Sequence, residues 1–449
     1  MTAHTNTGQL RPAPTGSQRL LSTWLETGRA AGIGAHVGRF GPPPLAAFRG
    51  HGGRERLIRL VEDAGLTGHG GAWFPTGRKL RAVAGARKRA VVIGNGCEGE
   101  RISEKDHALL TVAPHLVLDG LSLAAHAVAA DEAFLCVSRD DPLAATAAAA
   151  VAERTDDPVP VRVIEVPERY VSSEESALVN FINTGDARPT TRPPAVFERG
   201  VHGRPTLVDN VETLAHLALI ARYGADWFRQ QGTASAPGTA LFTLTGAVAR
   251  PGVHELPLGT TLADALRAAG GVTGPVQAVL LGGYAGTWVP MPQAAGWPLA
   301  PKELRTAGAA LGVAVVCALP ARACGLVETA RVVRYLADES ARQCGPCMFG
   351  LPAIDADFAD LAVGRGRIAR EASQRLRRRL DVITGRGACA HPDGAVRLAA
   401  SALRVFGHDV EAHAAGRPCP HAAAPPRLIV PAAVSPAPPG SSGSSEGWR

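Results

Sequence analysis

Three short apolar runs alternate with long helical segments in the first half of the chain, and this alternation restricts the fold more than any other feature. The runs at 89–96, 132–138 and 161–166 predict buried strands, and the segments at 115–130 and 142–154 predict the helices between them. Such an alternation builds a parallel sheet covered by helices, whose ligands bind beyond the carboxyl ends of the strands. We therefore expect an α/β layer with a binding site at that edge.

Two further patterns follow along the chain. The stretch 238–316 predicts a hairpin with a Pro-Gly turn, one helix and another strand, which together make a small α+β module. The stretch 325–410 is nearly all helical and predicts a bundle. Because 449 residues exceed what one core supports, we expect a multidomain α/β protein. Its predicted parts are a partly disordered N-terminal segment at 1–50, an α/β domain at 51–237, the small module at 238–316, a helical domain at 317–425 and a disordered tail at 426–449.

The charge balance and the apolar pattern exclude two classes of protein. The net charge of +7 comes from 47 basic and 40 acidic residues, and no aromatic residues interleave with the basic ones, so we expect no nucleic-acid binding. No apolar run is long enough to predict a transmembrane segment, and the N-terminus lacks the apolar stretch of a signal peptide. We therefore expect a cytoplasmic protein, in which the eight cysteines are metal ligands or free thiols rather than disulfides.

A glycine-rich stretch, GLTGHGGAWFPTGRKL at 65–80, precedes the first predicted strand. Glycines such as Gly68, Gly70 and Gly71 let backbone N–H groups approach an anionic ligand, and Lys79 adds a positive charge. A flexible surface loop is the alternative, although the FPT sequence that begins at Phe74 argues against simple flexibility.

A second polar stretch, GNGCEGERISEKD at 94–106, directly follows a predicted strand. Asn95, Glu98 and Glu100 stand where they can hydrogen-bond a ligand ring or a ribose. A solvated acidic loop is the alternative.

Two helix starts carry further candidates. In YVSSEESALVNFI at 170–182, Ser172 or Ser173 can cap a helix whose first turn contains two glutamates, and this structural role is sufficient by itself. In RPTLVDNVETLAHL at 204–217, Asp209, Asn210 and Thr213 begin another helix, either as an anion site or as a plain cap.

Three cysteines have the spacing of a metal centre. Cys344 and Cys347 form a C-x-x-C pair that opens a helix, and Cys389 follows in GRGACAHPDG. Thiolates at helix ends bind zinc or an iron–sulfur cluster, and His391 is a nearby fourth ligand for zinc. A redox-active pair is another alternative, but such pairs follow a strand in a βαβ unit. Buried free thiols are the structural explanation, and the other five cysteines have no such spacing: Cys97, Cys136, Cys317, Cys324 and Cys419.

Taken in order, these five motifs resemble those of the NADH-binding flavoprotein subunit of respiratory complex I and of related NAD-linked hydrogenases and formate dehydrogenases. The resemblance covers residues from about 50 to 421 and is carried by GHGGAWFPTGRK, NGCEGERISEKD, YVSSEESAL, GRPTLVDNVETL and ES…CGPC. The small module resembles the family's soluble-ligand-binding β-grasp insert. The stretch EAHAAGRPCP fits the family's end, which makes Cys419 a poor ligand candidate.

The resemblance implies a Rossmann-like FMN/NADH domain, a β-grasp insert and a helical bundle with an iron–sulfur cluster. The family takes hydride from NADH onto FMN and passes single electrons to a [4Fe-4S] cluster. By motif position, the FMN contacts are Gly68, Gly70, Lys79, Asn95, Tyr170, Glu174, Asn210 and Thr213, with Glu98 in the same cofactor-binding set. The dinucleotide is expected to meet Gly71, Phe74, Glu100 and Glu175, of which Glu100 and Glu175 orient the nicotinamide.

The cluster motif departs from the family's C-x-x-C-x-x-C pattern, because Ala341 stands at the first cysteine position. Three thiolates remain, on Cys344, Cys347 and Cys389. They can hold a [3Fe-4S] cluster, or a [4Fe-4S] cluster in which His391, water or another group binds one iron. Either change is expected to alter the reduction potential.

The cofactor pocket departs from the family as well. Trp73 replaces a glycine, and its ring could fill space meant for cofactor. His69 stands where the family has arginine, and Ser172-Ser173 where it has Cys-Gly. Asp209 replaces an asparagine near the expected phosphate, and Ala195 replaces an aromatic residue that supports the adenine, although Phe197 is close.

We predict an electron-transfer oxidoreductase with NAD(P)H as donor and a separate redox protein as acceptor, which the resemblance implies to be a thioredoxin-like [2Fe-2S] protein. A cytoplasmic location is expected, either free or peripheral on a membrane redox complex. The alternatives are a non-catalytic iron–sulfur carrier or scaffold that has lost NADH and flavin, and a zinc-stabilised interaction protein.

Overall fold

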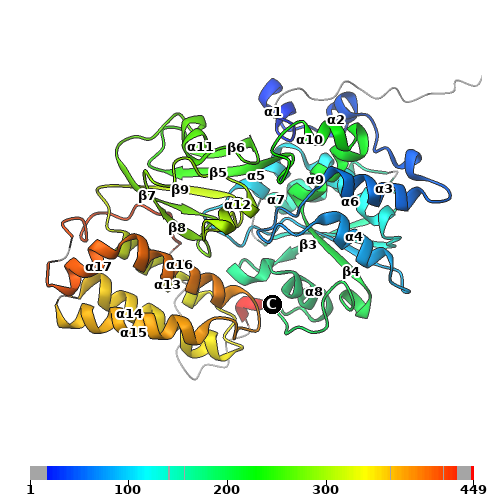
Figure 1. The fold of residues 1–449 in the computed structure, drawn as a ribbon. Coiled ribbons are helices and arrows are strands. Elements are labelled where there is room, and N and C mark those ends of the chain that lie inside the picture. The colour runs from blue at the N-terminus through cyan, green and yellow to red at the C-terminus, as the bar shows by residue number, and fades with distance from the viewer. Residues whose placement is uncertain (1–17, 140–141, 156, 365, 418, 432–445) are drawn as a thin grey trace, which may run out of the picture.

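The computed structural model describes residues 18–139, 142–155, 157–364, 366–417, 419–431 and 446–449, and Figure 1 shows two sheets and a helical bundle among them. The first sheet has four parallel strands in the order β3-β2-β1-β4. These strands are β1 (Val91–Asn95), β2 (Glu132–Ser138), β3 (Val161–Val166) and β4 (Thr206–Asn210). Asn95 pairs with Asn210 in the register of β1 and β4, so the last residues of both strands lie side by side at the carboxyl edge where ligands of such sheets bind.

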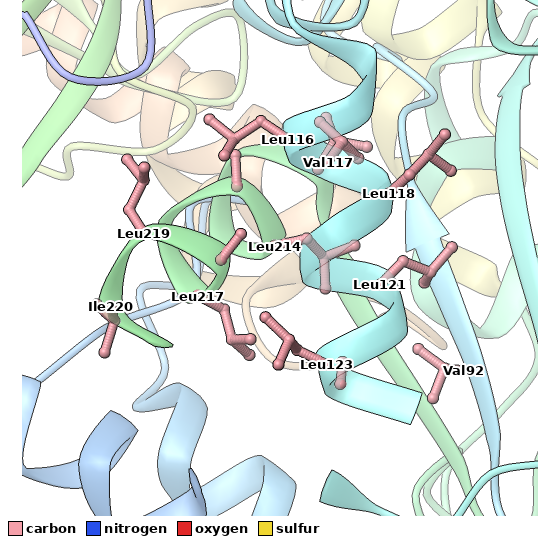
Figure 2. Close-up of a cluster of buried hydrophobic side chains, with 14 of the residues drawn as sticks. Val92, Leu116, Val117, Leu118, Leu121, Leu123, Leu214, Leu217, Leu219 and Ile220 are labelled. Carbon is pink, nitrogen blue, oxygen red and sulfur yellow. The ribbon is translucent and has the colours of Figure 1, made fainter. Parts of the chain in front are cut away.

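Two apolar helices cover this sheet and form the largest core. In Figure 2, α6 (Pro114–Ala127) crosses α9 (Val211–Tyr223) beside β1, with Leu121 and Leu214 near Val92. Gly120 makes the close crossing possible, because a Cβ atom there would lie 1.9 Å from the carbonyl oxygen of Leu214. Around them lie α1 (Ser22–Thr27), α2 (Ile33–Phe40), α3 (Gly53–Ala64), α4 (Thr76–Ala84), α5 (Lys105–Val112), α7 (Leu143–Ala152), α8 (Glu175–Thr184) and α10 (Ala225–Arg229).

The second sheet has five strands in the order β6-β5-β9-β7-β8. The strands are β5 (Thr239–Gly246), β6 (Gly252–Pro257), β7 (Val276–Leu281), β8 (Thr287–Pro290) and β9 (Val315–Pro320), accompanied by α11 (Leu262–Ala268) and α12 (Pro301–Thr306). Strands β5 and β6 form the expected antiparallel hairpin. The N-terminal end of the described chain is fixed to this hairpin, since one carboxylate oxygen of Glu255 accepts the backbone N–H groups of Arg19 and Leu20, each at 2.8 Å.

The C-terminal bundle consists of α13 (Gly325–Asp338), α14 (Leu351–Val363), α15 (Arg367–Ile383), α16 (His391–Val405) and α17 (Gly407–Ala414), with a π-helical turn at Pro346–Gly350 before α14. Trp288 of β8 joins the bundle to the second sheet. Its indole N–H donates to the hydroxyl of Thr329 (3.0 Å), and its backbone N–H donates to that of Ser401 (2.9 Å). One buried core therefore continues from the second sheet into the bundle.

The last described residues pack on the body of the protein. The backbone N–H groups of Arg427 and Leu428 donate to the carboxylate of Glu328. Trp448 is buried, and its carbonyl oxygen accepts the N–H of Ala187 (2.8 Å). The rest of the predicted tail, at 432–445, and the first 17 residues lie outside the described part of the chain.

The predicted multidomain α/β fold is confirmed: the strands β1, β2 and β3 and the helices α6 and α7 lie where the alternating pattern put them. Strand β4 was not predicted, whereas a helix does follow the C-x-x-C pair, as predicted, and the helical stretch at the end of the bundle is divided into α16 and α17 at Phe406. Among the described residues no single helix is long and apolar enough to cross a membrane. The pair α5 and α6 passes that test only together, and it is bent by 97°.

Candidate functional site

The glycine-rich stretch folds as a closed turn between α3 and α4. The N–H of Gly68 donates to the carbonyl oxygen of Phe74 (2.8 Å). The N–H of His69 donates to the hydroxyl of Thr213 on α9 (2.9 Å). These bonds hold the turn against the start of α9, so the alternative of a flexible surface loop is wrong.

Bare backbone in this turn faces the N-terminus of α9. A Cβ atom on Gly70 would lie 3.5 Å from that of Asn210, which caps α9 by accepting the N–H of Glu212 (3.1 Å). Gly71 has a φ of +103°, a conformation that favours glycine. Glycine backbone beside a capped helix start is a suitable cradle for an anionic group such as the phosphate of FMN.

Lys79, the predicted cation of this cradle, is already paired. Its ammonium group lies 2.5 Å from the carbonyl oxygen of Val208, 3.4 Å from a carboxylate oxygen of Asp209 and 4.0 Å from one of Glu175. Burial raises the pKa of Asp209, and the charge of Lys79 opposes that rise. The other carboxylate oxygen of Asp209 is buried without a hydrogen-bond partner among the described residues. Asp209 therefore reduces the positive charge that Lys79 can offer to a phosphate.

The two asparagines at the strand ends, Asn95 and Asn210, lie within one polar network. Asn95 donates to the carbonyl oxygen of Ser173 (2.8 Å). Asn210 donates to the carboxylate of Asp106 (2.8 Å) and accepts from the ammonium group of Lys105 (3.1 Å). Sequence reasoning missed Lys105 and Asp106 as site residues, although both lie at the end of the second motif.

The two glutamates of the second motif have different environments. Glu98 accepts the backbone N–H of His107 (3.1 Å), and burial, with Asp106 nearby, raises its pKa to about 7. Glu100 accepts the hydroxyl of Tyr170 and the N–H of Tyr284, both at 2.9 Å, and burial raises its pKa to about 8. The other carboxylate oxygen of Glu100 has no hydrogen-bond partner in the described part of the chain. Glu100 is buried and Glu98 is half-buried and hydrogen-bonded, so this stretch is not a fully solvated acidic loop.

The third motif gives one helix cap, Glu174, and one half-buried acid, Glu175. Glu174 rather than a serine caps α8, because its carboxylate accepts the N–H groups of Ser176 (2.8 Å) and Ala177 (3.2 Å). Arg192 bridges the carboxylates of Glu174 (2.8 Å) and Glu175 (2.5 Å). Glu175 also faces Lys79, which joins the third motif to the glycine turn.

Trp73 does not project into an open cleft. Its ring is 7% exposed, packs in the core of the second sheet and donates its indole N–H to the carbonyl oxygen of Gly312 (2.8 Å). The neighbouring Phe74 is 50% exposed, and Phe197 is 41% exposed. Two aromatic side chains, Phe74 and Phe197, thus remain accessible to a planar ligand. The aromatic ring that the family has at position 195 is absent, because this residue is alanine.

The three predicted cysteines come together from two loops of the bundle. The thiols of Cys344 and Cys389 both act electrostatically on that of Cys347, and Cys344 also acts on Cys389, so the three sulfurs are neighbours. Burial raises the pKa of Cys347 and of Cys389. Among the described residues these sulfurs do not meet within 4.8 Å as a trio, as ligands of one ion would. Three grouped but spread thiols suit a cluster of several irons, and their donor chemistry fits it.

Aromatic rings connect these sulfurs with the flavin side. Tyr170, which donates to Glu100, lies with its ring 5.3 Å from that of His391. His391 donates Nε2–H to the carbonyl oxygen of Leu336 (2.7 Å), which leaves Nδ1 buried without a partner among the described groups, and its own backbone N–H bonds to Cys389. The carboxylate of Glu174 also acts on Cys389. The predicted flavin residues and the predicted cluster ligands are therefore neighbours in space.

A second sulfur group lies elsewhere in the bundle. Cys324, His413 and Cys419 each place one ligand atom within 4.8 Å of the others. The N–H groups of the first turn of α13 bond to the sulfur of Cys324, and Nδ1 of His413 donates to the carbonyl oxygen of Leu361 (2.9 Å). Nε2 of His413 accepts the backbone N–H of Cys419 (3.2 Å), so both imidazole nitrogens are hydrogen-bonded and a zinc ion would have to displace one of these bonds. Cys419 is a poor ligand for the cluster by its sequence position, and it lies in this separate group. The sequence separation of Cys324 and His413 hid the group.

The fold and these sites define a class: an α/β nucleotide-binding unit joined through a β-grasp sheet to a helical bundle with grouped thiols, as in iron–sulfur flavoproteins. Three family descriptions match the chain. They are the Nuo51 FMN-binding domain over residues 61–219, the SLBB domain over 241–283 and the NADH-ubiquinone oxidoreductase-F iron–sulfur binding region over 327–413.

Comparisons with individual proteins indicate the same family. The F subunit of NADH-quinone oxidoreductase from Mycobacterium tuberculosis (strain H37Rv) is 32% identical over 383 residues, which are 81% of this chain and 86% of that protein. The corresponding Escherichia coli K12 protein is 30% identical, over 80% of this chain and 84% of its own. A solved NAD+-reducing [NiFe]-hydrogenase aligns over 94% of this chain and 69% of its own, at 30% identity and a TM-score of 0.77.

The chain belongs to the NADH-quinone oxidoreductase family whose members form the F subunit of that enzyme. The predicted resemblance, the electron-transfer role and the FMN, NADH and iron–sulfur cofactors are thereby confirmed. The family match identifies the cofactors but not the residues of this chain that bind them.

Proposed function

We propose that this chain oxidises a nicotinamide dinucleotide beside the glycine turn and delivers the electrons to a cluster held by Cys344, Cys347 and Cys389. The observation that carries the proposal is the contact chain from Glu100 through Tyr170 to His391 and Cys389. These successive contacts connect the predicted flavin site with the predicted cluster ligands. FMN, when bound, supplies the exchange of one electron pair for two single electrons, and the iron–sulfur cluster supplies single-electron acceptance.

On the flavin side, the residues that bind and orient come from four segments. Gly70 and Gly71 offer backbone N–H groups, Gly68 closes the turn, and Thr213 fixes the turn to α9, which Asn210 caps. The opposite side of the predicted flavin site is lined by Asn95, Glu98, Tyr170 and Glu174. Polar side chains that are already positioned by hydrogen bonds lose little entropy when a cofactor binds.

The dinucleotide is expected at the exposed end of the same site. Phe74 presents half of its surface as a stacking face, and Glu175 presents carboxylate oxygens for ribose hydroxyls. Glu100 faces the nicotinamide with its unpaired carboxylate oxygen, which accepts a hydrogen bond when ionised and donates one when protonated. Its pKa of about 8 keeps the proton on that oxygen near neutrality.

An acceptor protein has a surface to dock on beside the cysteines. Met348 and Phe349 directly follow Cys347 and are 51% and 71% exposed. We propose that a redox partner covers them, and that this partner is a thioredoxin-like [2Fe-2S] protein. Single-electron transfer to such a partner needs a short path from the cysteines, and this exposed apolar pair provides the contact. The assembly would be cytoplasmic, with this chain peripheral on a membrane redox complex.

The test is anaerobic purification followed by NADH addition in a stopped-flow absorbance instrument. Flavin bands should bleach first and the broad cluster absorbance should fall afterwards. Tyr170→Phe removes only the hydroxyl that bonds Glu100, so it should slow the second phase or lower nicotinamide affinity. A protein with cluster absorbance, no flavin and no response to NADH would contradict the proposal and favour a non-catalytic carrier.

A further inference from the structure

Two buried imidazoles with unsatisfied ring nitrogens and one buried carboxylate lie together beneath the glycine turn. His69 belongs to the turn, and Glu212 and His216 lie one helical turn apart on α9. Nε2 of His69 is 3.8 Å, and Nε2 of His216 is 3.9 Å, from the same carboxylate oxygen of Glu212. All three side chains are at most 2% exposed.

Neither imidazole makes a hydrogen bond of good geometry with the described protein groups. All four ring nitrogens are buried and unpaired there, although the backbone of Thr67 and Thr239 lies near the rings. Each unsatisfied buried polar group costs about 1–3 kcal/mol. Each neutral ring carries one N–H and one lone pair, so the two imidazoles offer two nitrogen lone pairs beside one carboxylate, which a cation could bind.

We propose that His69, Glu212 and His216 bind one zinc ion. Two imidazoles and a carboxylate are a donor set that zinc takes in proteins. One ligand atom from each residue lies within 4.8 Å of the other two, so a small inward shift closes the site around an ion. Nitrogen and oxygen ligands of zinc sit about 2.0–2.2 Å from the metal.

The surroundings orient the ligands. The carboxylate oxygen that faces both rings accepts the N–H of Leu241 on β5 (2.7 Å). The other oxygen pairs with the ammonium group of Lys105 (3.0 Å). Glu212 thus stands between Lys105 and the proposed ion, with one oxygen for each, which limits the repulsion between the two cations. Metal ligands are commonly fixed by such outer hydrogen bonds.

The position of the site indicates a structural role. The ligands and Leu241 join the glycine turn, α9 and strand β5 of the second sheet. The ring of His69 is 4.8 Å from that of Trp73, and the ring of His216 is 5.5 Å from that of Phe228. These rings and the burial of the site leave no access for a substrate. His69 also stands where the family has arginine, so the site is a feature of this chain and not of the family's cofactor machinery.

The experiment must separate this zinc from sulfur-bound zinc in the bundle. The full chain carrying Cys324→Ala and Cys419→Ala is grown with zinc chloride and analysed by plasma mass spectrometry and zinc K-edge absorption. About one zinc per chain is expected, with nitrogen and oxygen as the only directly bound atoms and imidazole scattering beyond them. His216→Asn in that background should remove this zinc, whereas His126→Asn, on α6, should not.

Two results would overturn the proposal: a zinc content near zero in the double-cysteine variant, or zinc that survives His216→Asn. Glu212→Gln keeps the shape of the carboxylate and provides a second ligand removal if the histidine variant fails to fold. The absorption spectrum of the double-cysteine variant with both histidines intact needs neither further variant, because bound zinc without imidazole scattering would itself contradict the assignment.

Discussion

The predicted flavin site, called the cleft below, and the cysteine loops both depart from the family's residues, but they respond differently. In the cleft, the unusual residues find partners within the chain: Asp209 pairs with Lys79, and Trp73 packs into the second sheet. At the cysteine loops, Ala341 is 9% exposed and packs among apolar residues of the α/β unit, where an alanine methyl group offers iron no donor atom. Within the described part of the chain, His391 has a buried, unpaired nitrogen beside Cys389.

This difference follows from the chemistry of the two sites. A cofactor cleft is built from many weak contacts, so a changed residue can be balanced by a neighbour. A cluster is held by a few strong metal–thiolate bonds, and a missing ligand is balanced only by another donor at the same place. Single substitutions in the cleft should therefore change cofactor affinity by moderate amounts. A single lost thiolate in the cysteine loops should instead remove the whole cluster.

The largest effect is expected for Cys347→Ala. Cys347 is buried and interacts with both other sulfurs, so its loss leaves two thiols for the cluster. Iron content should fall close to zero, and the melting temperature of the bundle should drop. Cys136→Ala, which removes another buried cysteine, is the control and should keep its iron. Iron unchanged in the Cys347 variant would show that the ligands are elsewhere.

Restoring the family's cysteine at position 341 tests whether the missing cluster ligand can be replaced at the same place. Ala341→Cys should add a fourth thiolate and so lower the reduction potential of the cluster, because a thiolate adds negative charge that water or imidazole lacks. A redox titration followed by electron paramagnetic resonance measures the shift. His391→Leu should change the spectrum of the original protein and leave that of Ala341→Cys unchanged. A potential unaffected by the new cysteine would mean that residue 341 does not reach the cluster.

The features that could be predicted from the sequence alone also differ from those that could not. Strand periodicity predicted β1, β2 and β3, and the cysteine spacing predicted the grouped sulfurs, because both patterns are local. Strand β4 was missed because it directly joins α9, so its residues were interpreted only as the start of that helix. The groups around Glu212 and Cys324 could not be predicted, since their members meet only through tertiary packing.

A graded effect is expected in the cleft for Asp209→Asn. The carboxylate lies 3.4 Å from Lys79, and its removal frees the ammonium group for the phosphate of FMN. Affinity for FMN should rise about tenfold, equivalent to about 1.4 kcal/mol. Riboflavin has no phosphate and should bind both proteins alike, and Asp226→Asn, at an exposed carboxylate on α10, should change neither affinity. Equal gains for riboflavin would place the phosphate away from Asp209. Fluorescence titration measures both ligands.

The smallest effect concerns the pH dependence of stability through Glu100. Its pKa is about 8 in the folded protein and 4.5 in its usual state, so the folded chain holds the proton more tightly than the unfolded chain. Between those two pH values unfolding releases a proton, and the stability contributed by the protonated group is therefore lost as pH rises from about 4.5 to about 8. Glu100→Gln keeps an acceptor for Tyr170 and Tyr284 but cannot ionise. Its free energy of unfolding should fall less steeply across that window, by up to about 1.4 kcal/mol per pH unit.

Urea denaturation at pH 5, 6.5 and 8 should be used for that measurement. Burial also raises the pKa of Glu98 and of Glu255 to about 7, but both remain in the variant, so the difference between the two proteins isolates Glu100. The same slope in both proteins would show that Glu100 is already ionised in the folded state. The nicotinamide would then meet a negatively charged carboxylate rather than a proton donor. The predicted flavin site would carry one more negative charge than it does with Glu100 protonated.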